Sequence, residues 1–346
     1  AAVLDFSHPP AERLAVHRES IFLGSAERSQ REQRLAEIAD YLRTIGEPGG
    51  PDAELMLEAS DIEHSLGRFE AALVHAKTAR AAFQGIDDCL NEAVAAGRMA
   101  DILAVRGQLD EALHIRVAEE LPVYERLGDM RSKAVAQGKI ADIFASRGQL
   151  DEALRIRVAE ELPVYERLGD MRSKAVAQAK IGDILASRGQ LDEALRILIQ
   201  EALLSFQRLG DIRSEAVTQG RIADILAALG QLDEALRIRM EDQLPVYERL
   251  GDVREKAATE GEIAGILVSR GQLDEALHIL REEVLLAFER LGDVRSKAIT
   301  QGRIADILAS RGQFDEALAL HEQRLPVAER LGDIELIAHV KYSMAS

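Results

Sequence analysis

The sequence predicts an all-α protein, built as a right-handed α-solenoid of stacked antiparallel helix pairs. One observation behind this prediction is the composition: 47% of the 346 residues are hydrophobic, yet the chain has only 8 Phe, 5 Tyr and no Trp. A core so poor in aromatic side chains must consist of Ala, Leu, Ile and Val, and Ala and Leu are strong helix formers. The other observation is a periodic spacing of glycines.

Glycines recur along the chain in two interleaved series. The first series has a constant spacing of 41 residues: Gly107, Gly148, Gly189, Gly230, Gly271 and Gly312. The second series has the same spacing and ends on one interval of 40 residues: Gly128, Gly169, Gly210, Gly251, Gly292 and Gly332. Repeats of this length indicate supersecondary units that stack in one dimension and bury their apolar faces against their neighbours.

Each repeat contains two predicted helices. In one copy the first helix runs from Asp170, a good N-cap residue preceded by Gly169, to about residue 188. Gly189 ends this helix, and a second amphipathic helix follows over about residues 191–209. Because the connecting loops have only two or three residues, the two helices are expected to be antiparallel neighbours.

The repeats divide the chain into three parts. Seven helix pairs are expected over residues 51–332, starting near residues 52, 88, 129, 170, 211, 252 and 293. Residues 333–346 are predicted to form a lone helix that caps the end of the stack. Residues 1–50 are expected to be an irregular helical segment, with helices over residues 11–22 and 27–45.

The unit Ile181–Leu195 resembles the tetratricopeptide repeat (TPR). The TPR pattern has a small residue in the first helix, Gly at the turn, Leu or an aromatic residue after it, and Ala in the second helix. The matching positions are Gly182, Gly189, Leu191 and Ala194. With Arg-Leu-Gly-Asp between pairs, the unit looks like the extended repeat of Pins/LGN adaptors and kinesin light chain. The resemblance covers about residues 52–346 and implies the fold, whereas a fold alone does not specify a function.

The sequence departs from the TPR pattern in two columns of the repeat. The early aromatic residue of the first helix is replaced by Gln or Glu: Gln137, Gln178, Gln219, Glu260 and Gln301. The Asn that related adaptors use to hold a peptide backbone is replaced by Asp: Asp142, Asp183, Asp224 and Asp306.

The resemblance implies that the first helices line a concave wall that carries two charged columns. The cationic column contains Arg98, Lys139, Lys180, Arg221 and Arg303, and the other contains Asp101, Asp142, Asp183, Asp224 and Asp306. The members from residue 139 onward, with Gln137, Gln178 and Gln219, are the candidate peptide-binding side chains. The alternative is that the cations and carboxylates, three residues apart in each helix, only pair with each other on a solvated face. Both columns are interrupted in one repeat, at Glu262 and Gly265, which favours pairing.

Two further columns suggest local constraints on the helices. Gly inside a helix costs about 1 kcal/mol relative to Ala. It nevertheless recurs in the first helices at Gly97, Gly138, Gly220, Gly261 and Gly302, with Ala179 as the exception. Either a neighbouring helix or the backbone of a ligand must approach closely there. The second helices contain Pro122, Pro163, Pro245 and Pro326, with Leu204 and Leu286 in matching places. Proline is expected to kink these helices and so to set the curvature of the array.

Several classes of function are disfavoured by the sequence. A formal net charge of −17 without a basic tail argues against nucleic-acid binding. No apolar run approaches the ~18 residues of a membrane span. No zinc-binding spacing, phosphate-binding Gly-rich loop or nucleophile elbow occurs, so no metal, cofactor or catalytic residue is expected. The single cysteine, Cys89, excludes an intrachain disulfide and favours a reducing, cytoplasmic location.

The sequence therefore favours a protein-interaction scaffold that is not an enzyme and that binds an extended or helical partner segment in its concave groove. Because of the Asp column and the net charge, a basic or neutral protein or peptide is expected as the partner. The alternative is the sensor or regulatory arm of a larger signalling protein, such as a nucleotide-switch ATPase or a caspase-like protease. The start of the sequence, which lacks Met, fits a segment of such a longer chain.

Overall fold

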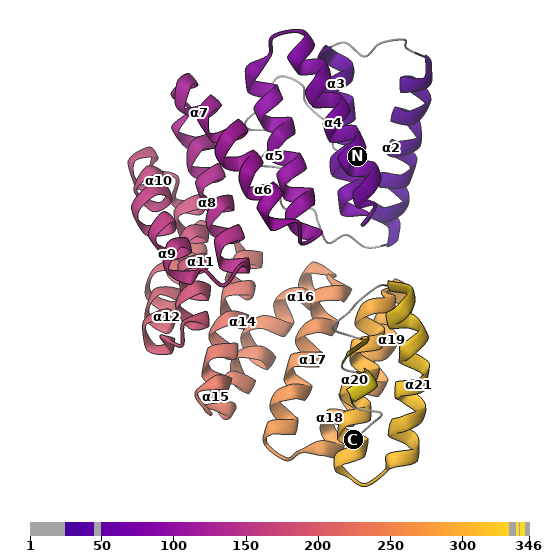
Figure 1. Ribbon diagram of the computed structural model, residues 1–346. Coiled ribbons are helices and arrows are strands. Elements are labelled where there is room, and N and C mark those ends of the chain that lie inside the picture. The colour runs from indigo at the N-terminus through magenta and orange to yellow at the C-terminus, as the bar shows by residue number, and fades with distance from the viewer. Residues whose placement is uncertain (1–24, 45–49, 332–336, 339, 343–346) are drawn as a thin grey trace. The chain divides into compact units, whose positions relative to one another are not determined.

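The structure is a computed structural model that describes residues 25–44, 50–331, 337–338 and 340–342. Every regular element in this part of the chain is helical (Figure 1). The helix predicted over residues 27–45 is confirmed as α2, whereas the one predicted over residues 11–22 lies outside the described residues. Most of the predicted capping helix also lies outside them.

The chain divides into two compact units, Ala1–Ser205 and Phe206–Ser346. The first unit contains α2 (Ser25–Thr44), α3 (Gly50–Ser65) and α4 (Phe69–Gly85). The first helices of the following pairs are α5 (Cys89–Val105), α8 (Met130–Ser146) and α11 (Met171–Ser187) in the first unit, and α14 (Ile212–Ala228), α17 (Val253–Ser269) and α20 (Val294–Ser310) in the second.

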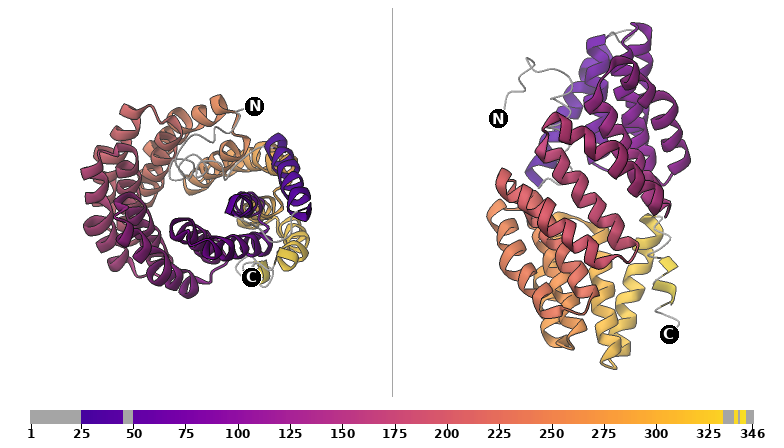
Figure 2. Two further views of the ribbon diagram at one scale, coloured as in Figure 1. Left: turned by 90° about the horizontal axis from the view of Figure 1, so that it is seen from above. Right: turned by 90° about the vertical axis from the view of Figure 1, so that its left-hand side faces the viewer.

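The second helices of these pairs consist of consecutive segments. In the first unit they are α6 (Leu109–Ile115), η1 (Arg116–Glu120) and α7 (Leu121–Leu127), then α9 (Leu150–Ile156), η2 (Arg157–Glu161) and α10 (Leu162–Leu168), then α12 (Leu191–Ile197), η3 (Leu198–Leu203) and α13 (Leu204–Leu209), which extends into the second unit. In the second unit they are α15 (Leu232–Arg237), η4 (Ile238–Gln243) and α16 (Leu244–Leu250), then α18 (Leu273–Ile279), η5 (Leu280–Val284) and α19 (Leu285–Leu291), then the continuous α21 (Phe314–Leu331). Within each unit, the two helices of a pair lie side by side (Figure 2).

Local capping interactions fix where the first helices begin. The carboxylate of Asp170 accepts a hydrogen bond from the backbone N–H of Ser173 at 3.0 Å, which confirms the predicted N-cap. Gly169 has φ of 66°, a left-handed backbone conformation that residues other than Gly rarely adopt. An N-cap aspartate and a preceding left-handed residue therefore start this helix at the predicted position.

The core consists mainly of alanine and branched aliphatic side chains, as the composition predicts. In one cluster Ile140 and Ala141 of α8 pack against Ala153 and Ile156 of α9 and against Ile184 of α11. Because Ile184 belongs to the following pair, neighbouring pairs share one core. The small alanine side chains let the helices approach closely, so the stack needs few aromatic residues.

Five of the second helices contain a π-helical segment, η1 to η5, in their middle. Hydrogen bonds in a π-helix join residues i and i+5, so each turn holds more residues than an α-helical turn. The five helices with a π segment lie between left-handed glycines that are 21 residues apart, as in Gly148 to Gly169. For α4 the corresponding interval, Gly67 to Asp87, is 20 residues. Helix α21 also follows a 20-residue spacing, and both α4 and α21 lack a π segment. One additional residue per repeat therefore coincides with the π turn.

Proline is not the cause of this irregularity. Pro122 and Pro163 lie in the first turn of α7 and α10, directly after a π segment, where a missing N–H is tolerated. The π segments η3 and η5 form as well, although Leu204 and Leu286 replace the proline there. The π segments therefore do not require proline, and the expected influence of proline on the curvature of the array stays a prediction.

Deletion of Val158 from η2 tests the role of the additional residue. We expect one continuous α-helix in place of α9, η2 and α10, because the interval between the flanking glycines falls to that of α21. The pair Arg157 and Glu161 moves out of register, so we also expect a loss of about 1–3 kcal/mol in the free energy of unfolding. Cα chemical shifts and denaturant titrations measure the two effects. Val158→Ala, which keeps the spacing, is the control, and a π segment that persists after the deletion contradicts the explanation.

Candidate functional site

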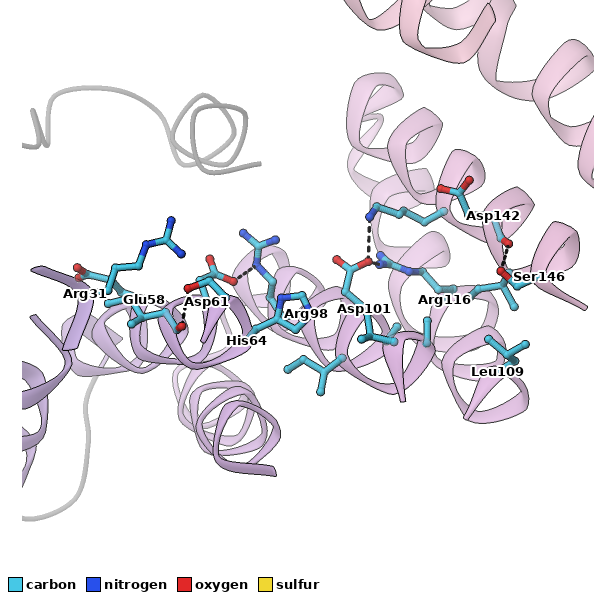
Figure 3. A pocket seen from close by; sticks show the side chains of 18 of the residues that line it. Arg31, Glu58, Asp61, His64, Arg98, Asp101, Leu109, Arg116, Asp142 and Ser146 are labelled. Atoms are coloured by element: carbon cyan, nitrogen blue, oxygen red, sulfur yellow. Dashed lines mark hydrogen bonds and ion pairs between the residues drawn. The ribbon is translucent and has the colours of Figure 1, made fainter. Parts of the chain in front are cut away.

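Two cavities open between the helices of the first unit. One has a volume of about 540 Å³ and is lined by residues of α2, α3, α5, α6, η1 and α8 (Figure 3); we call it the N-terminal cavity. The other has a volume of about 530 Å³ and extends over α5, α8 and α11; we call it the groove. Both cavities expose residues from the same face of α5 and α8, so they share several charged side chains.

The groove repeats one set of side chains from each of its first helices. Each of α5, α8 and α11 contributes a valine and a cationic residue, and α5 and α8 also contribute an aspartate: Val94, Arg98, Asp101, Val135, Lys139, Asp142, Val176 and Lys180. The groove therefore has a periodic lining of apolar and charged groups, which is suited to an extended ligand that crosses several repeats.

The structure brings together three of the predicted site residues, Lys139, Asp142 and Lys180, in this groove. The others on the first helices are Asp183 of α11, Arg221 and Asp224 of α14, and Arg303 and Asp306 of α20.

The predicted glutamines do not line the groove. Gln137 is 6% exposed, and its amide nitrogen donates to Glu160 of η2 at 2.7 Å. Gln178 is buried in the same way and donates to Glu201 of η3 at 2.5 Å. Placing these two glutamines on a ligand-binding wall is therefore a wrong prediction, because they point between the two helices of a pair. Gln219 of α14 has a side-chain oxygen that is also buried.

The charged columns pair with each other, but between neighbouring helices. Lys139 of α8 lies 3.1 Å from Asp101 of α5, measured from Nζ to Oδ1. Lys180 of α11 lies 3.5 Å from Asp142 of α8 in the same arrangement. Both lysines thus form an ion pair with the carboxylate of the preceding repeat.

The same arrangement explains why one position of the cationic column holds an acidic residue, Glu262. In the second unit Arg303 of α20 lies 2.8 Å from Glu262 of α17, and it also donates to the backbone oxygen of Gly261 at 2.9 Å. Glu262 therefore serves as the carboxylate partner of the following repeat, a role that aspartate fills elsewhere.

A buried arginine of the second helix forms an ion pair with each groove aspartate. Arg116 is 2% exposed, and its Nη2 lies 2.7 Å from Oδ1 of Asp101 while its Nη1 bonds Glu120. Arg157 contacts Asp142 at 2.7 Å and Glu161 at 2.5 Å in the next repeat. A buried charge is tolerated only when it is paired and hydrogen-bonded, and two carboxylates meet this requirement.

These charges keep the groove aspartate ionised. Burial raises the pKa of the Glu161 carboxyl, although the charge of Arg157 opposes this effect. Burial acts in the same direction on Asp142, but Arg157, Lys180 and Lys139 outweigh it and hold the Asp142 pKa below its usual range. Asp142 therefore remains a charged hydrogen-bond acceptor at neutral pH.

In most repeats the glycine column leaves space for a buried arginine and its partner, which cross the first helix; Gly261, whose pair has Leu280 and Val284 there, is an exception. A Cβ atom added at Gly97 would lie 2.6 Å from Oε1 of Glu120 and 3.0 Å from Nη1 of Arg116. The close approach is made by side chains of the paired second helix, and not by the backbone of a helix or of a ligand.

In the repeat formed by α11 and the second helix that follows it, the residues at these positions differ. Leu198 and Ala202 stand there in place of the arginine and its carboxylate partner, and Ala179 stands in place of the glycine. The glycine of this repeat is Gly182, where an added Cβ would lie 2.8 Å from Cδ2 of Leu198. In this repeat the glycine lies opposite Leu198, whereas the repeat with Leu280 and Val284 keeps its glycine at Gly261, so a leucine at this position does not by itself move the glycine. Sequence reasoning missed the buried arginines, although their recurrence at one position of the second helices, Arg116, Arg157 and Arg239, carried a signal.

Other kinds of site are not found in the described residues. No group of three or more His, Cys, Asp or Glu side chains there is placed to hold a metal ion. None of the described helices combines the length and the apolar character needed to cross a bilayer. Cys89, the first residue of α5, is exposed and forms no disulfide.

Comparison with known proteins supports the repeat architecture. Residues 255–330 match the model of the tetratricopeptide repeat. No curated protein matches this chain at a significant level.

Solved structures share the fold at low sequence identity. The quorum sensor NprR from B. thuringiensis, in its apo form, is 14% identical with a TM-score of 0.63, over 92% of this chain and 85% of its own. A Rap protein complexed with Competence and Sporulation Factor is 16% identical with a TM-score of 0.59, over 97% of both chains. A signal transduction ATPase with numerous domains (STAND) from Pyrococcus horikoshii, which has a TPR sensor, is 17% identical with a TM-score of 0.60, over 84% of this chain and 44% of its own. The predicted TPR-like solenoid fold is confirmed.

The variant Gly138→Ala tests the role of the glycine column. The added methyl group collides with Glu161 and Arg157, so we expect a net loss of about 1–3 kcal/mol in the free energy of unfolding despite the better helix propensity of Ala. Gly265→Ala is the matched control, because nothing lies within 4 Å of its added Cβ, and we expect a gain of up to about 1 kcal/mol. Denaturant titrations measure both effects.

A combined variant separates the collision from other causes. Gly138→Ala, Ala141→Gly, Arg157→Leu and Glu161→Ala together reproduce the set found at residues 179, 182, 198 and 202. We expect this variant to regain most of the lost stability. A combined variant no more stable than Gly138→Ala alone contradicts the explanation.

Proposed function

We propose that this chain is a non-catalytic interaction scaffold that binds an extended peptide or a partner segment in the groove of the first unit. The observation that supports it is the groove itself, whose lining repeats across three consecutive helix pairs. Valines of the lining offer apolar contacts, and the lysines and aspartates offer hydrogen bonds to a backbone or to side chains. The periodic lining matches the regular spacing of an extended segment.

The partner that we propose is a basic or neutral segment. The chain carries a formal net charge of −17, which repels a strongly acidic partner at a distance. Asp101 and Asp142 are fixed on the wall by buried arginines. Ionised carboxylates only accept hydrogen bonds, so they suit the N–H groups of a backbone or of Arg and Lys side chains. The single cysteine fits a reducing compartment such as the cytoplasm.

The alternative is that the chain is the sensor or regulatory arm of a larger signalling protein, such as a nucleotide-switch ATPase or a caspase-like protease. The STAND ATPase described above combines a sensor of the same fold with a longer chain. The two functions are compatible with one groove, since a sensor also binds a ligand. The coding sequence on either side of this chain distinguishes them, because an adjoining ATPase or protease domain supports only the second.

Selection from a random peptide library, with the full chain as bait, tests the scaffold proposal. Peptides selected on the native chain are then measured against Val176→Arg, which places a bulky cation in the groove at a side chain that is 39% exposed. We expect at least about tenfold weaker binding, because apolar contact is replaced by a steric and charge conflict. Val158→Arg is the control, since Val158 is 48% exposed on η2 and does not line the groove. Equal losses in the two variants contradict binding in the groove.

A further inference from the structure

The N-terminal cavity combines an aliphatic floor with ionised groups. Ile62, Ile102, Leu109 and Ile143 line it together with the carboxylate of Asp101. A long cationic side chain has the complementary character, because its methylene stem packs on apolar surface while its charged end needs a carboxylate. Figure 3 shows Asp101 and Arg116 facing each other. It also shows Asp61, which comes from the preceding helix pair, facing Arg98.

The charges around Asp101 separate into a fixed set and an exchangeable one. The fixed set is Arg116 with Asp101 and Glu120, in which one buried cation serves two carboxylates. This set has a formal charge of −1. Lys139, which comes from the next helix pair, supplies the balancing positive charge at 3.1 Å from Asp101.

Lys139 is the member of this cluster that can leave at low cost. Its side chain is 35% exposed, whereas that of Arg116 is 2% exposed. An exposed ion pair contributes little net stability, because solvent competes for both groups and the long side chain loses conformational freedom. Removal of Arg116, by contrast, would leave two carboxylates without their buried partner.

We propose that the N-terminal cavity binds the guanidinium or ammonium group of a partner's Arg or Lys side chain, and that Lys139 is its intramolecular competitor. The incoming cation takes the place of Lys139 on Asp101, while its stem lies on the floor formed by Ile102 and Ile143. Arg116 acts as a positioning residue, because it holds the Asp101 carboxylate without touching the ligand. This inference rests on the proposed function and specifies the chemistry of the partner.

A capped arginine, N-acetyl-arginine methylamide, is the probe for this cavity. The δ1-methyl NMR signals of Ile62, Ile102 and Ile143 in the full chain report its binding, and capped glutamine and capped glutamate serve as the neutral and anionic comparisons. We expect capped arginine to shift these signals at the lowest concentration of the three probes. Asp101→Asn, which keeps an acceptor oxygen for Arg116, is expected to weaken the binding by more than about fivefold.

The variant Lys139→Ala distinguishes a competitor from a ligand-binding group. If Lys139 competes, capped arginine binds about 1.5- to 5-fold more tightly to the variant, which corresponds to the loss of an exposed ion pair. Lys133→Ala is the matched control, because it removes one positive charge from the same helix, where Lys133 pairs with Glu125 outside the cavity. Equal affinity gains in the two variants overturn the proposal, because they would come from net charge alone.

Two other outcomes also overturn it. One is weaker or unchanged binding of capped arginine to Lys139→Ala, and the other is preferential binding of capped glutamate that Lys139→Ala abolishes. Failure of capped arginine to bind while library peptides still bind the groove would remove this inference and leave the scaffold function intact. Binding of capped arginine to the cavity, with no library peptide selected on the native chain, would leave this inference intact and remove the scaffold function.

Discussion

Within a unit of this array, a helix pair has an apolar face that the following pair covers, and the rest of the structure depends on that constraint. The shared core of Ile140, Ala153 and Ile184 shows it, since these residues come from two successive pairs. Alanine-rich contacts bring successive first helices close together and in constant register. Residues at the same repeat position therefore lie side by side, so Lys139 meets Asp101 and Lys180 meets Asp142.

The buried arginines add a second constraint, which acts inside each pair. A guanidinium group that reaches from the second helix across the first helix needs space, which Gly97 and Gly138 provide because they have no side chain. It must also be given carboxylates, which come from both helices. Where Leu198 replaces the arginine, the glycine changes position as well. Side-chain volume and charge are thus balanced within the pair, and the orientation of the groove aspartate is the result.

The groove that results is polar but largely compensated in charge, on a protein whose formal net charge is −17. Its carboxylates, Asp101 and Asp142, pair with buried arginines, whereas its lysines, Lys139 and Lys180, are partly exposed. A partner therefore meets preorganised acceptors and flexible cations, and preorganisation lowers the ordering cost of binding. This arrangement favours the exchange of one cation for another on a groove carboxylate over the binding of an acidic segment.

The sequence by itself determined the class of fold and the ends of helices such as α11, because Asp170 and Gly169 act through neighbours only a few residues away. It also marked positions of close approach such as Gly97 and Gly138, because Gly inside a helix is otherwise unfavourable. Only the tertiary structure decided which groups meet: Lys139 with Asp101 of another helix, and Gln137 turned inward toward Glu160. The physical reason is that helical periodicity fixes the face of a residue only to within a broad sector. The partner of a long side chain is then chosen by packing and charge between helices, which no local sequence pattern encodes.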